Sequence, residues 1–152
     1  MRQIKQIILH CSATPDYPIT AENFDRFTAS DIDRWHRERG WDEIGYHWVV
    51  TRAGKVEPGR AEMFQGAHCI GQNPDSIGIC YIGTKIPTCF QIASLYCLIS
   101  DVMRRYKLDF KDVFPHSKYK KTECPGISIP SLIYAFLEIH TINLDNRRIL
   151  DE

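Results

Sequence analysis

The sequence predicts one domain of the α/β or α+β class. Its 152 residues suit a single domain, because domains cluster near 100–150 residues. Hydrophobic residues make up 43% and charged residues 25% of the chain, as in ordinary globular proteins. Short apolar segments with strand character alternate with amphipathic segments of helical period, which indicates a sheet with helices packed against it.

The first elements are a buried strand and a helix. Residues 4–9 form an isoleucine-rich apolar run, which predicts a strand. Two prolines and several turn-forming residues then take the chain out of the sheet. Ser30 and Asp33 fit a capping box, and Gly40 is suited to end the helix that begins there.

The middle of the chain predicts a hairpin followed by another buried strand. Residues 46–51 are rich in β-branched and aromatic side chains, which favours a strand. Ala53-Gly54 predicts a turn into a returning strand at residues 55–57. Residues 76–82 alternate small and apolar side chains, so we expect a further strand there.

The last third predicts two helices around a short strand. Thr88 and Gln91 form a second capping box, and apolar side chains over residues 92–106 recur at helical spacing. We expect a strand at residues 113–114 and a final helix over residues 130–140.

Composition and charge argue against two classes of partner. Nineteen Lys and Arg balance nineteen Asp and Glu, and proteins whose main partner is nucleic acid are usually basic. No apolar run approaches the roughly 18–20 residues of a membrane span, and residues 1–6 lack the core of a signal peptide. We therefore expect a monomer of cytoplasmic synthesis, with a domain over residues 1–140 and a C-terminal tail over residues 141–152.

The six cysteines are expected to be reduced thiols. Cys11, Cys80 and Cys97 lie in apolar stretches, where free cysteine behaves as a small hydrophobe. The chain has no CxxC pair and no export signal, which also favours free thiols.

Three residues form a possible zinc-binding set. His10 and His116 each end a short apolar strand and precede a loop, and Cys124 follows His116 by eight residues. Two imidazoles and a thiolate suit zinc, and three protein ligands leave the fourth position for a water whose pKa the metal lowers towards about 7. The spacing alone is a weak signal. The alternatives are polar groups at strand ends beside a core thiol, or a thiol hydrolase with Cys124 as nucleophile and His116 as base.

Further segments carry a more specific pattern. They are His10-Cys11-Ser12-Ala13-Thr14, Trp35-His36-Arg37 with Gly40-Trp41, Ile44-Gly45-Tyr46-His47, Gly54-Lys55-Val56-Glu57-Pro58-Gly59-Arg60, Gly66-Ala67-His68, Asn73-Pro74-Asp75-Ser76-Ile77-Gly78-Ile79 and Cys124-Pro125-Gly126. In order and approximate spacing these segments resemble the zinc-dependent N-acetylmuramoyl-L-alanine amidases, the family of T7-type phage lysozyme and the peptidoglycan recognition proteins. The resemblance covers roughly residues 4–137 and implies a central mixed β-sheet flanked by helices.

The resemblance also implies an activity and a ligand set. It makes His10, His116 and Cys124 the ligands of a Zn²⁺ ion, and Tyr46 the phenol beside the attacking water. The reaction would be hydrolysis of the amide between N-acetylmuramic acid and L-alanine in peptidoglycan or muropeptides. Positions that match the substrate groove of the family are His36, His68 and Asn73.

Two positions depart from the common family pattern. Thr122 stands where phage-type members usually have lysine and several catalytic recognition proteins have threonine. The resemblance implies that Thr122 assists the developing oxyanion as a neutral donor. Pro115 stands where the family commonly has glycine, and it fixes φ and removes a backbone donor before His116.

Two other functions remain open within the resemblance. A peptidoglycan-binding module without activity commonly lacks the cysteine ligand, whereas Cys124 is present here. A regulator of a phage-type RNA polymerase is suggested only by analogy to one branch of the family. A cytoplasmic amidase would reach the cell wall after lysis or by another export route.

Overall fold

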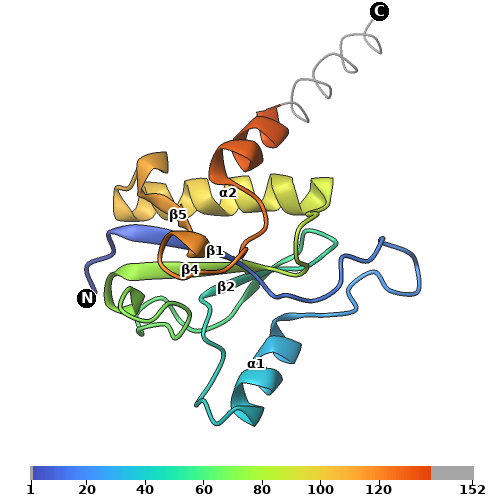
Figure 1. The fold of residues 1–152 in the computed structure, drawn as a ribbon, viewed down its shortest axis with the longest axis horizontal. Helices are drawn as coiled ribbons and strands as arrows, with labels where there is room; N and C mark the ends of the chain where they lie inside the picture. The colour runs from blue at the N-terminus through green and yellow to red at the C-terminus, as the bar shows by residue number, and fades with distance from the viewer. Residues whose placement is uncertain (1, 138–152) are drawn as a thin grey trace, which may run out of the picture.

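A computed structural model describes residues 2–137 as a five-stranded mixed sheet with helices on both faces (Figure 1). The strand order is β3-β2-β4-β1-β5, with β3 antiparallel to β2 and the other neighbours parallel. The elements are β1 (Gln6–Cys11), α1 (Ala29–Glu38), β2 (Trp48–Val50), β3 (Val56–Pro58), η1 (Asn73–Asp75), β4 (Ser76–Tyr81), α2 (Cys89–Tyr106), η2 (Phe110–Asp112), β5 (Val113–Pro115) and η3 (His116–Lys118). The predicted mixed sheet flanked by helices is confirmed.

Two hydrophobic layers enclose the central strands. Helix α2 packs on one face, where Ile7 and Leu9 of β1 meet Leu95 and other apolar residues. Helix α1 packs on the opposite face through Ile32, which joins a second cluster on β2 and β4. Because both faces are covered, the six residues of β1 are all buried, which explains the continuous apolar run of this strand. Side chains alternate along a strand, so His10 points to the α1 face.

The first capping box lies two residues earlier than the sequence predicts. Thr28 is the N-cap of α1, and its backbone N–H and hydroxyl both bond the Asp31 carboxylate. Asp33 is engaged elsewhere, because its Oδ1 accepts from the Ile44 N–H at 2.7 Å. The assignment of Ser30 and Asp33 as the cap was therefore wrong, although Gly40, with φ of 87°, does follow the end of this helix.

Later elements agree more closely with their predictions. Thr88 and Gln91 form the predicted capping box of α2. Pro115 lies in β5 at the edge of the sheet, which is where proline is tolerated within a sheet. The final helix begins at residue 129. Residues 138–152, which include the last three positions of the predicted helix and the proposed tail, lie outside the described residues.

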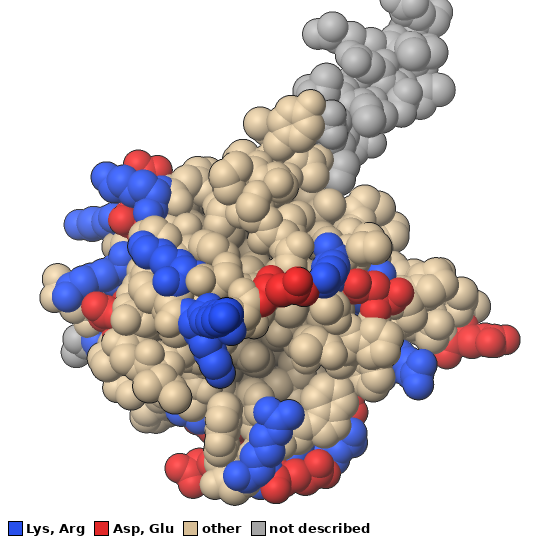
Figure 2. Space-filling model, in the orientation of Figure 1, with Lys and Arg blue, Asp and Glu red and all other residues tan. Residues whose placement is uncertain are grey.

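All six cysteines are free, but Cys97 is exposed on α2 rather than packed in the core. Lys and Arg side chains are interspersed with Asp and Glu over the face drawn in Figure 2. Among residues 2–137, no helix combines the length and apolar character required to cross a membrane.

Candidate metal centre and active site

Strand pairing brings two of the predicted ligands together. Strands β1 and β5 are parallel neighbours, and their register places Leu9 beside Pro115. His10 and His116 follow at the next positions, and their ring centroids lie 4.4 Å apart. The carboxyl ends of parallel strands share one edge of the sheet, so this pair is a direct consequence of the sheet order.

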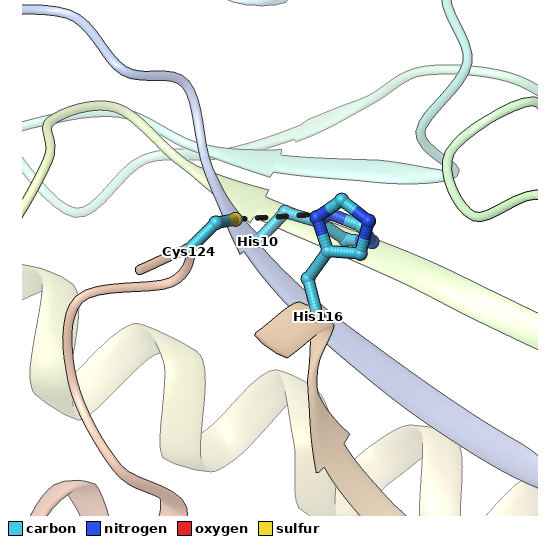
Figure 3. A group of neighbouring side chains, drawn as sticks. All are labelled: His10, His116 and Cys124. Atoms are coloured by element: carbon cyan, nitrogen blue, oxygen red, sulfur yellow. Dashed lines mark hydrogen bonds between the residues drawn. The ribbon is translucent and has the colours of Figure 1, made fainter. Parts of the chain in front are cut away.

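The loop after η3 returns the third ligand to the same point (Figure 3). The Ser117 N–H bonds the carbonyl of Cys124 at 2.9 Å, which closes the loop. The Cys124 Sγ lies 3.9 Å from His10 Nδ1 and accepts a hydrogen bond from the Cys11 N–H at 3.3 Å. One ligand atom from each of His10, His116 and Cys124 lies within 4.8 Å of the others.

The donor set fits zinc. Tetrahedral bonds of about 2.0–2.3 Å place nitrogen and sulfur ligands about 3.4–3.6 Å apart, so the ligand atoms, which lie within 4.8 Å of one another, must close by roughly 1 Å to bind the ion. Burial lowers the pKa of His10 well below its usual value, and His68 and His116 add to this effect. Burial also lowers the pKa of His116, with Lys120 contributing. Both imidazoles are therefore neutral at pH 7, as metal ligands must be.

The Cys124 thiol interacts with the Cys11 side chain. The hydrogen bond between the two side chains is the largest cause that raises the pKa of the Cys124 thiol, and burial is the next largest. The Cys11 N–H acts in the opposite direction, since it donates to the same sulfur. A cation at the three-ligand site would complete the stabilisation of the Cys124 thiolate.

Tyr46 lies beside the ligands but not on a strand. The prediction of a strand from residue 46 was wrong, because β2 begins at Trp48. Backbone contacts fix Tyr46 instead: its carbonyl accepts from the Arg60 N–H at 2.8 Å, and the preceding Gly45 N–H bonds His36 Nδ1 at 3.0 Å. The Tyr46 ring lies 5.1 Å from that of His10. Burial raises the pKa of Tyr46 well above its usual value, so its hydroxyl is a neutral donor.

A cavity of about 530 Å³ opens next to this cluster. His68 and Asn73, which the sequence predicts as groove residues, line this cavity, and so does His116. His36 does not line it. Only 7% of His36 is exposed, and its ring lies against Trp41 with centroids 4.4 Å apart. The predicted groove contact of His36 is thus replaced by a structural role in supporting the turn before Tyr46.

Thr122 has a defined contact with the ligand loop. Its Oγ1 accepts a hydrogen bond from the Cys124 N–H at 3.2 Å, and the residue is otherwise exposed. The contact leaves the hydroxyl hydrogen of Thr122 free to donate elsewhere.

Sequence reasoning missed several residues of the site. Trp41 and Tyr119 also line the cavity. Ser76 bonds the ring of His68, and the Cys11 backbone bonds the sulfur of Cys124. Trp41 and Ser76 lie in the family-like segments, but no local pattern indicates their contacts across the fold.

Comparison with known proteins identifies the family. Residues 1–127 match the family described as N-acetylmuramoyl-L-alanine amidase. The chain belongs to this amidase family. The endolysin of Escherichia phage T7 is 43% identical over 77 residues, which are 51% of this chain and 46% of that protein. The match thus spans about half the length of this curated relative.

Solved amidase-family structures share the fold. The N-acetylmuramoyl-L-alanine amidase LysC from Clostridium intestinale has a TM-score of 0.74 and 27% identity, covering 91% of this chain and 87% of that one. The peptidoglycan recognition protein LE, solved with tracheal cytotoxin (a monomeric diaminopimelic acid-type peptidoglycan), has a TM-score of 0.70 and 27% identity. This alignment covers 83% of this chain and 76% of that one.

Proposed function

We propose that this protein hydrolyses the amide bond between N-acetylmuramic acid and L-alanine in peptidoglycan or muropeptides. One observation carries the proposal: His10, His116 and Cys124 converge within 4.8 Å beside a cavity of about 530 Å³. Membership of the amidase family and the peptidoglycan fragment bound by a structural relative support the same substrate class.

Each side chain of the centre has a chemical task. His10 and His116 provide neutral imidazole nitrogens, and Cys124 provides sulfur, so these three residues would hold zinc. When bound, zinc supplies a Lewis acid that polarises a carbonyl and lowers the pKa of water. Tyr46 donates a hydrogen bond to the oxygen that gains negative charge, and Thr122 offers a second neutral hydroxyl.

The reaction is an addition of water across an amide. The water oxygen bonds to the lactyl carbonyl carbon, and the carbon–nitrogen bond to L-alanine then breaks. One product has a lactyl carboxylate on the sugar. The other is a stem peptide whose new amino terminus has taken both protons of the water and is therefore an ammonium group.

Digestion of purified peptidoglycan tests the proposal. We expect mass spectrometry to find stem peptides with new L-alanine amino termini and no increase in reducing sugar ends. Cys124→Ser is the matched control and should release nothing. New reducing ends would contradict amide cleavage, and binding of the wall without any release by the zinc-loaded wild type would indicate a binding module. Full activity after metal removal would favour the thiol hydrolase.

A further inference from the structure

We propose that His68 is a positioning residue for the ligand His10: it accepts a hydrogen bond from His10 Nε2–H and so directs the lone pair of His10 Nδ1 to the metal position. The inference rests on the proposed function, because it concerns the metal centre of the same site. It assigns His68 a task other than the groove contact that the sequence predicts.

The two nitrogens of His10 face different partners. Nε2 lies 3.0 Å from His68 Nδ1, and Nδ1 lies 3.9 Å from the sulfur of Cys124. The His10 and His68 rings meet edge to face, with centroids 5.0 Å apart and planes at 82°. The nitrogen that faces Cys124 is on the ligand side, and the nitrogen that faces His68 is on the protein side.

A hydrogen-bond chain determines which nitrogens carry protons. The Ser76 hydroxyl donates to the Gln72 carbonyl at 2.7 Å, so at the 3.3 Å contact with His68 Nε2 its oxygen is the acceptor. His68 Nε2 therefore carries the hydrogen and His68 Nδ1 has the lone pair. His10 Nε2 must then be the donor at the 3.0 Å contact, which leaves a lone pair on His10 Nδ1.

Close packing holds the His68 ring in this orientation. A Cβ atom at Gly66 would lie 2.6 Å from the ring, and one at Gly78 would lie 2.5 Å from it, so glycine at both positions creates the space for the imidazole. The backbone is fixed as well, because Asn73 Oδ1 accepts from the N–H groups of His68 and Cys69 at 3.0 and 2.8 Å. The acceptor is thus pre-positioned before any metal binds.

The same chain limits what His68 can do in the cavity. Its Nδ1 is occupied by His10 and its Nε2 by Ser76. No ring nitrogen remains for a hydrogen bond to substrate, although the ring carbons still line the cavity. Hydrogen-bonding partners of metal-bound histidines fix the tautomer and raise the basicity of the ligand, and their loss typically lowers metal affinity by about 10- to 100-fold.

Zinc affinity of three variants tests the inference. His68→Leu keeps the volume but removes the acceptor, and we expect its zinc dissociation constant in chelator competition to rise about 10- to 100-fold. His68→Asn can place an amide oxygen near the position of Nδ1, so it should recover most of that loss. Ser76→Ala removes only the outer acceptor and should weaken zinc binding less than His68→Leu does.

Side-chain ¹⁵N NMR of the zinc-loaded wild type gives a readout that does not depend on a variant. We expect a proton on His10 Nε2 and on His68 Nε2, and metal bound to His10 Nδ1. Metal on His10 Nε2 would overturn the inference, as would a His68→Leu protein that folds and binds zinc as tightly as wild type. If His68→Leu does not fold, the NMR result decides. Neither readout needs substrate, so an inactive wild type that shows this tautomer would reject only the proposed function.

Discussion

Replacing Tyr46 by phenylalanine separates the hydroxyl of this residue from its packing. The substitution removes one oxygen and leaves the ring, whose centroid lies 5.1 Å from that of His10, 5.6 Å from His36 and 6.4 Å from His68. These neighbours hold the ring on several sides, so zinc content and folding should not change. We expect the loss to fall on kcat.

The size of the effect follows from how firmly the donor is placed. Removal of one pre-positioned oxyanion donor typically costs about 100- to 1000-fold in kcat. Tyr46 meets this condition, because its backbone bonds Arg60 and its raised pKa keeps the hydroxyl protonated. Thr122 is exposed and is held only through the Cys124 N–H, so Thr122→Ala should cost about tenfold by the same reasoning.

Steady-state kinetics on a soluble muropeptide, with the zinc content measured in each sample, tests the expected loss in kcat of each variant. The wild type, Thr122→Ala and Tyr46→Phe should bind equal amounts of zinc, and kcat should decrease in that order. A Tyr46→Phe enzyme with near-normal kcat would refute the reasoning. The ring would then serve only packing, and oxyanion stabilisation would have to come from the metal, Thr122 or backbone N–H groups.

Three further predictions concern the metal, the pH dependence and the core. Cys124→Ser should lose zinc and activity together while keeping the fold, as checked by metal analysis and circular dichroism; retained stoichiometric zinc would argue against this ligand. Burial alone would raise the pKa of Glu62. Hydrogen bonds from Arg105, Tyr106 and Trp48 outweigh the effect of burial and lower this pKa to about 2. Because this folded-state pKa lies below the unfolded value of about 4.3, the stabilisation is present at neutral pH and is lost as pH falls from about 5 to about 2. Glu62→Gln should therefore lower the free energy of unfolding by about 1–2 kcal/mol at pH 7, with a smaller difference from wild type in urea titrations at pH 3. Leu95→Ala removes a fully buried side chain between α2 and the sheet, and should cost about 2–5 kcal/mol in the same titrations; a loss below about 1 kcal/mol would mean that the core closes over the gap.

Local signals in the sequence predicted most of the elements. The apolar run of β1, the Thr88–Gln91 cap of α2 and the turn at Gly54 each depend on residues within a few positions of one another. Local signals gave the wrong result where two nearby residues can both serve as the N-cap of the same helix. Thr28 and Ser30 are both suitable N-caps, and the choice was made by Ile44, whose N–H engages Asp33 from 11 residues away.

The family-like segments led to the prediction of a ligand set and a groove, but they did not distinguish the positions of individual histidines in the fold. In the sequence, His36 and His68 both lie at positions that match the substrate groove of the family. In the fold, the His36 ring accepts a hydrogen bond from the Gly45 N–H, whereas His68 lies in the cavity wall and contacts His10. The difference depends on where each ring lies relative to the sheet edge, which adjacent residues do not specify.

The sequence by itself therefore determined most of the helices and strands and the types of side chain that could bind a metal. Only the tertiary structure decided that these donors meet. Parallel pairing of β1 and β5 aligned Leu9 with Pro115 and so brought His10 next to His116. The contact between Cys11 and Cys124 spans 113 residues, and that between His10 and His68 spans 58. Such contacts arise from sheet order and loop closure, which result from burial of the whole core rather than from any local pattern.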